Sequence, residues 1–376
     1  MKPLTLEVNY RVDVRVDKKH GNITIADIAE IAGVSTATVS RVLAGSPKVS
    51  PATRATVRHV ITELDYEPNQ LARGLTTART YNVGVVLQDI ANPFFVEVAL
   101  GVEHELREAG YSMFLTSSAW DPQKEDELVR KLVRNRVDGV VIAPIEPDGE
   151  TVALLKRRGI PFVLVNAEST DPDVSWVSTN NYHGGALAAR VLIETPAQTL
   201  VSLLGFPHQT SRARRDGFLS VVREVAGRRS LEFRPRERVY NFDDGYQCVS
   251  DLIATERIQE TPAGIFALND DVALGVIAAL IDHGIPVPQQ VSVVGYDDIP
   301  SAQRFQVPLT TVAQPKRQMG HLAATVLLGH LENPTADAVH YELLPRLVQR
   351  SSTMPLHRPE TGRRLGDPNP PGEEEP

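Results

Sequence analysis

The stretch TIADIAEIAGVSTATVSRVLAG, residues 24–45, decides the first part of the fold. Thr24 followed three residues later by Asp27 predicts the capped start of a helix. The inward face of that helix consists of Ile25, Ile28, Ala29 and Ala32. Gly33 then permits a sharp turn, because glycine adopts backbone conformations that other residues avoid.

Ser35 predicts the cap of a second helix, whose Val39 and Val42 face inward. Five residues face outward at its N-terminal end: Thr36, Ala37, Thr38, Ser40 and Arg41. Arginine can chelate guanine, the methyl groups of threonine and alanine can meet thymine, and hydroxyls can bind phosphate. Two short helices around a turn, with this outward chemistry, are typical of a helix-turn-helix that places its second helix in the major groove.

A third helix is expected after Ser50, which serves as the cap, with Pro51 at the first position. The small core is closed by Val57, Ile61 and Leu64. A plain three-helix bundle is the alternative, but the charge distribution favours DNA. The whole chain of 376 residues carries a net charge of -8, whereas residues 34–62 contain no acidic residue. The basic residues there are Arg41, Lys48, Arg54 and Arg58.

Downstream of residue 80, buried-strand runs alternate with amphipathic helical stretches. The clearest runs are NVGVVL, YSMFL, GVVIA, PFVLV, TLVSLL, AGIFAL and VSVVGY. This alternation predicts parallel sheets covered by helices. About ten strand candidates exceed one ordinary sheet, so we expect two α/β lobes, with a break near Thr195 and a second crossing between Thr311 and Pro315. The lobes would comprise residues 81–195 plus 315–337 and residues 196–314 plus 338–353.

The two ends of the chain read differently. Residues 1–22 form an N-terminal extension, in which residues 4–17 alternate apolar and polar positions as a half-buried strand does. That extension is either an ordered part of the protein or lies upstream of the residue at which translation begins. Residues 354–376 contain six prolines and three glycines, a composition that predicts a disordered tail.

Several classes of protein are disfavoured. The single Cys248 excludes an internal disulfide and a multi-cysteine zinc site, no apolar run is long enough to span a bilayer, and we expect a cytoplasmic protein without cofactor or metal. An enzyme is disfavoured because GxGxxG, P-loop, HExxH and GxSxG motifs are missing. A solute-binding protein of a sugar importer would share the two lobes, but it should carry a signal peptide and no helix-turn-helix.

Ligands of such sheets bind at the carboxyl ends of the strands. Polar and aromatic residues follow several of the expected strands: Phe94, Phe95, Asn166, Arg214, Phe242, Asn269, Asp270 and Asp297. Planar aromatic rings beside arginine and aspartate suit a hydroxylated ligand. For Phe94 and Phe95, a place in the core is the alternative.

The residues resemble the lactose-repressor (LacI/GalR) family of bacterial regulators over residues 23–353. The resemblance is carried by VSTATVSRVL (34–43), VSPATR (49–54), LDYEPN (64–69), LARGL (71–75), GYDD (295–298) and PLTTVAQP (308–315). It implies a helix-turn-helix domain at 23–68, a hinge helix and linker at 69–80, and a periplasmic-binding-protein-like domain at 81–353 that binds an effector and forms the dimer.

The resemblance also assigns DNA contacts. Thr36, Ala37 and Arg41 correspond to base-reading positions, while Thr38, Ser40 and Ser50 are similar to phosphate contacts. Ala44 stands where the family usually has asparagine. In the hinge helix, which includes Arg73, Leu75 would insert at the central base step and kink the duplex from the minor groove.

For the effector, the resemblance implies the strand-end residues named above together with His208. Asn166 stands where an acid is common in the family, and Ala167 where a purine-binding relative carries an aromatic residue, so a sugar or sugar derivative is expected rather than a nucleobase. The implied protein is a homodimer and not a tetramer, because the tail lacks the leucine heptads through which some members of the family form tetramers. It would bind a palindromic operator, usually as a repressor, under the control of a small polar metabolite. Whether the effector is an inducer or a corepressor stays open.

Overall fold

The computed structural model describes residues 23–43, 45–66, 79–203, 208–225, 229–233, 239–256 and 262–354. The chain divides into two compact units, residues 1–80 and 81–376. The N-terminal extension, Ala44, the predicted hinge helix with Arg73 and Leu75, and nearly all of the tail lie outside the described residues.

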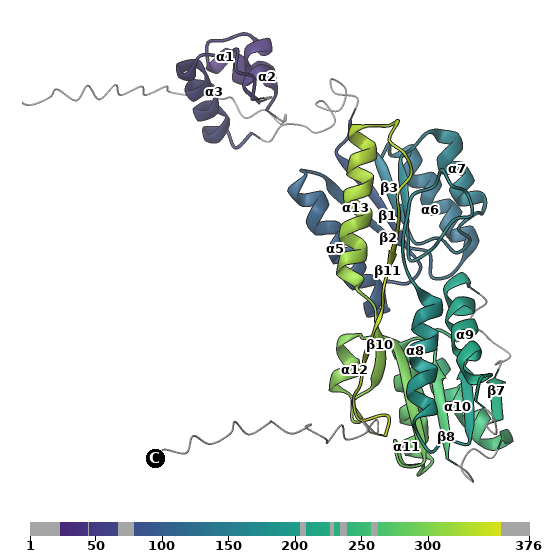
Figure 1. Cartoon of the computed structure of the whole chain (residues 1–376). Coiled ribbons are helices and arrows are strands. Elements are labelled where there is room, and N and C mark those ends of the chain that lie inside the picture. Colours follow the sequence, from purple (N-terminus) through teal and green to yellow (C-terminus); the bar gives the residue numbers. More distant parts are fainter. Residues whose placement is uncertain are drawn as a thin grey trace, which may run out of the picture. The chain divides into compact units, whose positions relative to one another are not determined.

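The first unit contains three short helices, labelled in Figure 1: α1 (Ile25–Ile31), α2 (Thr36–Leu43) and α3 (Pro51–Glu63). The predicted caps are confirmed. Thr24 and Asp27 form a reciprocal capping box, and Ser50 Oγ accepts a hydrogen bond from the main chain of the first turn of α3. Gly33 has a φ of 64° in the turn between α1 and α2. Ile28, Val39 and Val57 are fully buried at the centre of the bundle.

The second unit is built on two six-stranded sheets. The first sheet is entirely parallel, in the order β11-β5-β4-β3-β1-β2. Its strands are β1 (Asn82–Leu87), β2 (Ser112–Ser117), β3 (Gly139–Ile142), β4 (Phe162–Val165), β5 (Trp176–Thr179) and β11 (His340–Leu343). The helices of this first lobe are α5 (Pro93–Glu108), α6 (Pro122–Arg134), α7 (Glu150–Arg158) and α13 (Lys316–Glu332). Strands β1 and β3 are almost wholly buried, as parallel strands covered on both faces must be.

The second sheet has the order β12-β10-β9-β8-β6-β7 and is parallel except for the β10–β12 pair. Its strands are β6 (Thr199–Leu203), β7 (Arg229–Phe233), β8 (Ala263–Ala267), β9 (Val291–Asp297), β10 (Thr310–Ala313) and β12 (Arg346–Val348). The helices of this second lobe are α8 (Asn181–Ile193), α9 (Gln209–Val222), α10 (Phe242–Glu256), α11 (Asp270–Asp282) and α12 (Pro300–Arg304). The two-lobe prediction is therefore confirmed, with one antiparallel pair added.

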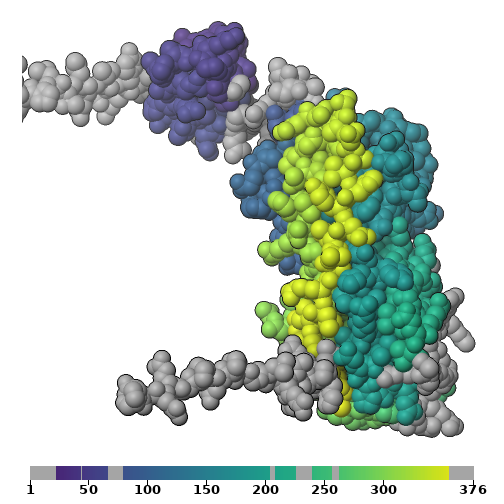
Figure 2. Space-filling view, in the orientation of Figure 1, coloured from purple at the N-terminus to yellow at the C-terminus, as the bar shows by residue number. Residues whose placement is uncertain are grey.

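The expected boundaries of the lobes need correction. Helix α8 packs against α9 and the second sheet, so the chain first crosses between Thr179 and Asn181 and not near Thr195. The second crossing, at Gln314–Pro315 after β10, falls in the range expected. The third crossing, expected between residues 337 and 338, lies instead between β11 and β12, because β11 pairs with β5 of the first lobe while β12 pairs with β10 of the second. Figure 2 shows the last described segment, in yellow, running along both lobes.

Three helix pairs approach so closely that a side chain would not fit between them. In each pair, a glycine of one helix lies against a main-chain carbonyl of the other, and a glycine of the second helix does the same in return. The glycines are Gly101 and Gly320 in α5 and α13, Gly185 and Gly217 in α8 and α9, and Gly245 and Gly275 in α10 and α11. The spacing of these helices is thus fixed by main chain.

Within the described ranges, no helix combines the length and apolarity needed to cross a membrane. The same residues include no group of three or more His, Cys, Asp or Glu side chains arranged to hold a metal ion. Cys248 is buried, and burial raises the pKa of its thiol to about 12.

Candidate DNA-reading helix and interlobe site

Helix α2 carries the predicted DNA-reading residues along its length: Thr36 and Ala37 lie in its first turn, whereas Arg41, expected near its N-terminal end, lies in its last turn. Thr38 is half-buried, and its main-chain N–H and its hydroxyl both bond to Ser35 Oγ, at 3.2 and 2.9 Å. The other predicted contacts of this helix are exposed: Thr36, Ala37, Ser40 and Arg41. The buried Val39 and Val42 hold the helix on the bundle, so this polar face is turned to solvent.

The three-helix unit that contains α1, α2 and α3, called the headpiece below, has further basic residues, and they differ in their exposure to solvent. Arg54 donates from Nη2 to Ser46 O at 2.6 Å and is half-buried, so it braces the loop between α2 and α3. Lys48 and Arg58 are exposed. Ser50 is exposed as well, although its hydroxyl already caps α3. A phosphate contact by Ser50 stays a prediction.

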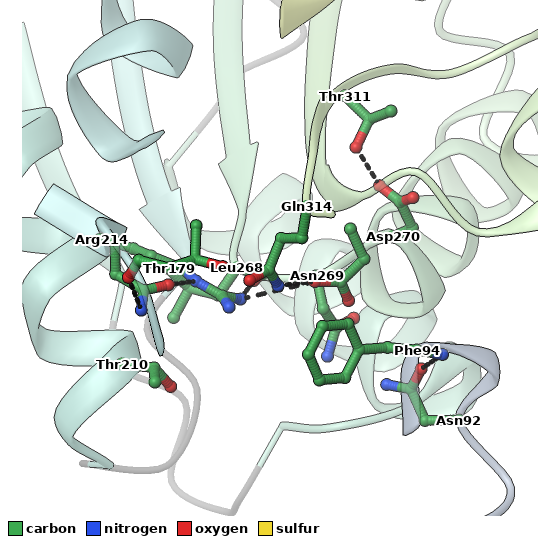
Figure 3. A network of polar contacts seen from close by, with 12 residues as sticks. Asn92, Phe94, Thr179, Thr210, Arg214, Leu268, Asn269, Asp270, Thr311 and Gln314 are labelled. Carbon is green, nitrogen blue, oxygen red and sulfur yellow. Dashed lines mark hydrogen bonds and ion pairs between the residues drawn. The ribbon is translucent and has the colours of Figure 1, made fainter. Parts of the chain in front are cut away.

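Arg214, on α9, lies at the centre of the interlobe site (Figure 3) and is 6 % exposed. Its Nε donates to Asn181 Oδ1 at 2.8 Å, and its Nη1 donates to Leu268 O at 2.5 Å. Nη1 also lies 3.9 Å from Asp297 Oδ1, and the guanidinium covers the ring of Tyr296. These partners fix the plane of the guanidinium, which is the condition for bidentate recognition of a ligand.

Asp297, at the end of β9, is held in a left-handed backbone conformation with a φ of 115°. Its Oδ1 accepts a hydrogen bond from Gln314 Nε2 at 2.7 Å, and Lys316 Nζ donates to its main-chain oxygen and to that of Asp298. Burial raises the pKa of Asp297 to about 6, while the Arg214 charge and the Gln314 hydrogen bond oppose that rise. Gln314 and Lys316 belong to the second crossing, so the crossing is attached directly to the site.

Asp270 and Asn269, at the start of α11, are engaged with the protein itself. Asp270 is fully buried, and its two oxygens accept hydrogen bonds from Ile299 N at 2.8 Å and Thr311 Oγ1 at 2.5 Å. Burial, and then the Asp297 charge, raise the pKa of Asp270 well above its ordinary value. Asn269 Oδ1 caps α11, and its Nδ2 donates to a main-chain oxygen before α10 at 3.0 Å. Both side chains shape the strand ends, and direct effector contacts by them stay predictions.

His208 caps α9 and reaches across to the first lobe. Its Nδ1 accepts from Thr210 N at 3.4 Å, and its Nε2 lies 3.2 Å from Pro144 O and 3.1 Å from Gln88 Nε2. Burial lowers the pKa of His208 to about 4, so the imidazole is neutral near pH 7. The predicted effector residue is thus also a contact between the lobes.

The predicted aromatic residues fall into two groups. Phe94 and Phe95, at the start of α5, are each 3 % exposed and pack edge to face with centroids 5.0 Å apart. Phe242 is half-buried and packs edge to face with Phe305 at 6.3 Å. Asn166 directly follows β4, has a φ of 55° and is 5 % exposed. Figure 3 shows Phe94 with Asn92, whose Oδ1 accepts a hydrogen bond from Phe94 N at 2.9 Å.

Sequence reasoning missed several side chains of this site. All follow a strand or flank a crossing, so the strand-end rule could have found them. They are Gln88, Trp120, Thr179, Asn181, Tyr240 and Gln314. Trp120 and Tyr240 stack on each other with centroids 4.6 Å apart, although they belong to different lobes.

Four buried polar atoms at these strand ends have no hydrogen-bond partner among the described residues. They are Gln88 Oε1, Asn166 Oδ1, Thr179 Oγ1 and Gln314 Oε1. Three are amide oxygens, which can only accept a hydrogen bond. Because a buried unsatisfied acceptor is costly, the site suits a ligand that brings several O–H or N–H donors.

Comparison with known families agrees with both parts of the chain. Residues 24–69 match the model for bacterial regulatory proteins of the lacI family, and residues 189–353 match the model for a periplasmic binding protein-like domain. The HTH-type transcriptional repressor PurR of Mannheimia succiniciproducens is 33 % identical over 334 residues, which cover 88 % of this chain and 98 % of the repressor. The PurR repressor of Haemophilus influenzae is 32 % identical over 338 residues, with the same coverage.

Solved structures are similar over the same range. The lac repressor dimer bound to operator and the anti-inducer ONPF has a TM-score of 0.78 and 25 % identity, covering 89 % of this chain and all of that one. The transcriptional regulator CelR in complex with cellobiose has a TM-score of 0.64 and 29 % identity, covering 88 % of this chain and all of that one. A regulator from Enterococcus faecium with bound ribose has a TM-score of 0.63 and 27 % identity, covering 73 % of this chain and 99 % of that one.

Proposed function

The chain belongs to the LacI family of bacterial regulatory proteins, which are transcriptional regulators and not enzymes, and we propose that it is a repressor. This repressor would bind a palindromic operator as a homodimer, under the control of a sugar or sugar derivative. The observation that carries the proposal is the exposed polar face of α2 on the same chain as a buried polar interlobe site. Because the proposed partner is DNA, the protein would act in the cytoplasm.

For DNA binding, the support comes from α2. Arg41 is exposed and can form two hydrogen bonds with a guanine, while Thr36 and Ala37 present methyl groups beside it. Thr38, Ser40 and Ser50 are proposed to contact phosphates. These roles rest on the family resemblance and on the exposed face of α2. The roles of Arg73 and Leu75 in the proposed hinge helix rest on the resemblance alone, because both lie outside the described residues.

For the homodimer, the support is a set of exposed apolar side chains along one edge of the first lobe. Val96 and Leu100 of α5 are 42 % and 43 % exposed, and Phe114 and Leu115 of β2 are 44 % and 42 % exposed. Strand β2 is the edge of its sheet, and α5 packs beside it. Large exposed apolar side chains grouped in this way mark a protein interface, and a two-fold axis through it would place two headpieces on a palindrome.

For the effector, the support is the chemistry of the buried polar atoms that have no hydrogen-bond partner among the described residues. A sugar carries several hydroxyl donors and a hydrophobic ring face, which suit three amide oxygens, Asp297 and half-buried aromatic rings. Cellobiose and ribose are bound in two of the similar regulators. A purine is the second candidate, because the curated relatives are repressors named PurR.

Selection of duplexes from a random library by the purified protein tests the DNA-binding proposal. We expect a palindrome with a flexible central step, and Leu75→Ala should reduce its affinity because the wedge is lost. Salt-sensitive binding without sequence preference would contradict the proposal. Sugars, sugar phosphates and purines are then compared by the shift in melting temperature; a shift by purines alone would replace the sugar.

A further inference from the structure

An aromatic stack crosses from one lobe to the other. The ring of Trp120, which follows β2 in the first lobe, stacks on the ring of Tyr240, which precedes α10 in the second, with centroids 4.6 Å apart and planes 14° apart. Trp120 also meets His208 of the second lobe at 5.7 Å and Phe95 of the first at 6.3 Å, both edge to face. A single indole therefore contacts both lobes.

The backbone that carries this indole is strained. Ala119 and Trp120 have φ values of 52° and 60°, a left-handed conformation that side chains with a Cβ rarely adopt. The turn is held by hydrogen bonds from Trp120 N to Gln88 O at 3.3 Å and from Asp121 N to Ser118 O at 3.1 Å. Such strain persists where the surroundings determine it, and it clusters at ligand clamps and switch regions.

Polar bonds join the lobes beside the stack. Gln209 Oε1 accepts from Glu168 N at 3.0 Å, and Gln209 Nε2 donates to Glu168 O at 3.0 Å. His208, the neighbour of Gln209, reaches Pro144 O of the first lobe at 3.2 Å. These contacts join segments other than the three crossings, which supply the hinge about which two such lobes can move.

We propose that Trp120 and Tyr240 form an aromatic latch that favours the closed arrangement of the lobes and bounds the effector cleft on its β2 side. The proposal rests on the effector-binding function proposed above. An effector must separate the two rings to enter or leave, so the pair limits both its rate of access and its size. An aromatic pair of this geometry shifts the ratio of closed to open lobes by roughly 2- to 12-fold.

The chain contains a matched control for the latch. It has two tryptophans, and Trp176 stacks on His340 with centroids 5.1 Å apart and planes 11° apart. Trp176 lies on β5 and His340 on the neighbouring strand β11, so this stack lies within one lobe. Loss of the control stack should change the local exposure of Trp176 but leave the lobes together.

Fluorescence and X-ray scattering of the full-length protein test the latch. Trp176→Phe leaves Trp120 as the only tryptophan. In this background, Tyr240→Ala should raise the acrylamide quenching constant of Trp120 at least about twofold and increase the radius of gyration. Tyr240→Phe should change neither, because the stack needs the ring and not the hydroxyl. Tyr240→Leu repeats the test if the alanine variant fails to fold.

In a Trp120→Phe background, His340→Ala should raise the quenching of Trp176 without changing the radius of gyration. The latch is refuted if Tyr240→Ala and Tyr240→Leu leave both readouts at the values of the parent protein, or if His340→Ala expands the protein as much as they do. Neither readout needs DNA or an effector. A failed operator selection therefore counts against the proposed function alone, and unchanged quenching counts against the latch alone.

Discussion

Arg214 covers the ring of Tyr296, with its guanidinium carbon 3.7 Å from the ring centroid. Two neutral acceptors and the Asp297 carboxylate surround the other sides of the guanidinium. A charged side chain that is buried to this extent is stable in the fold only when it has a complete set of hydrogen-bonding and charged partners. The same partners hold it still for a ligand.

Replacement of Arg214 should therefore cost stability as well as effector binding. Arg214→Ala leaves Asp297 buried without its cation, and we expect the free energy of unfolding to fall by about 3 kcal/mol. Arg214→Lys keeps the charge but loses the planar fork, so a fall of about 2 kcal/mol is expected. Urea unfolding measures both. Arg215→Ala is the control, since its partner Asp216 is exposed; an equal loss at both positions would contradict the assignment.

The glycine contacts between α8 and α9 predict damage to the site from a residue that touches no ligand. A Cβ on Gly185 would overlap the main-chain oxygen of Arg214, so Gly185→Ala must push the helices apart and move the guanidinium. We expect a loss of at least about 2 kcal/mol together with weaker effector binding. Gly329→Ala in α13 is the matched control, because nothing lies within 4 Å of its Cβ position and alanine favours helix by up to about 1 kcal/mol. Similar effects of the two changes on urea unfolding would argue against main-chain contact as the cause.

The burial of Glu125, on α6, should make the free energy of unfolding of the protein fall as the pH rises. Burial raises its pKa from 4.5 to about 7, and the charges of Glu146 and Asp126 add to that rise, against a hydrogen bond from Ile145 N. The folded state thus binds a proton that the unfolded state releases between pH 4.5 and about 7. Over that interval the group costs stability, to a total of about 3 kcal/mol above it.

Glu125→Gln removes this cost and keeps an acceptor for Ile145 N. We expect the variant to be more stable than the parent at pH 8, and the two to be alike at pH 5, in urea unfolding. Glu127→Gln, an exposed position on the same helix, should show no such dependence. A stability gap between variant and parent that is equal at both pH values would sink the explanation.

Two arginines of the headpiece, Arg41 and Arg54, should separate recognition from folding. Arg41→Ala removes an exposed side chain, so the melting temperature should hold while operator affinity falls by about 1–3 kcal/mol and the base preference at one position relaxes. Arg54→Ala removes the bond to Ser46 O and should lower the melting temperature. Gel-shift titration and calorimetry measure the two effects; an unaltered base preference in Arg41→Ala would contradict the base-reading role.

Local signals in the sequence predicted the headpiece in detail, because caps and turns depend on neighbouring residues. Thr24, Gly33 and Ser50 do what their residue types indicate. The boundary between the lobes was wrong because the small-residue face of α8 suits either sheet, and only its packing on α9 decides. Strand β11 was missed because most of its residues are exposed, which leaves no buried run to detect.

At the interlobe site, the rule of strand ends found Arg214 and Asp297, which lie 3.9 Å apart. The rule could have pointed to Trp120, which follows β2, but the direction of its ring depends on two left-handed residues that are not glycine, and no sequence pattern predicts that direction. Nor could it distinguish residues that face a ligand from those that brace the fold. Asp270 has a carboxylate at a strand end, yet both of its oxygens are bonded within the second lobe.

The threefold crossing of the chain has a consequence for synthesis on the ribosome. The headpiece is complete once Leu64 has been made, whereas the first lobe is complete only after β11, which ends at Leu343, and the second lobe only after β12. The 279 residues that follow Leu64, up to Leu343, take roughly 15 to 55 seconds to translate. Late in that time the nascent chain carries a finished headpiece and two sheets that each still lack one edge strand, which is the stage most exposed to aggregation and most dependent on chaperones.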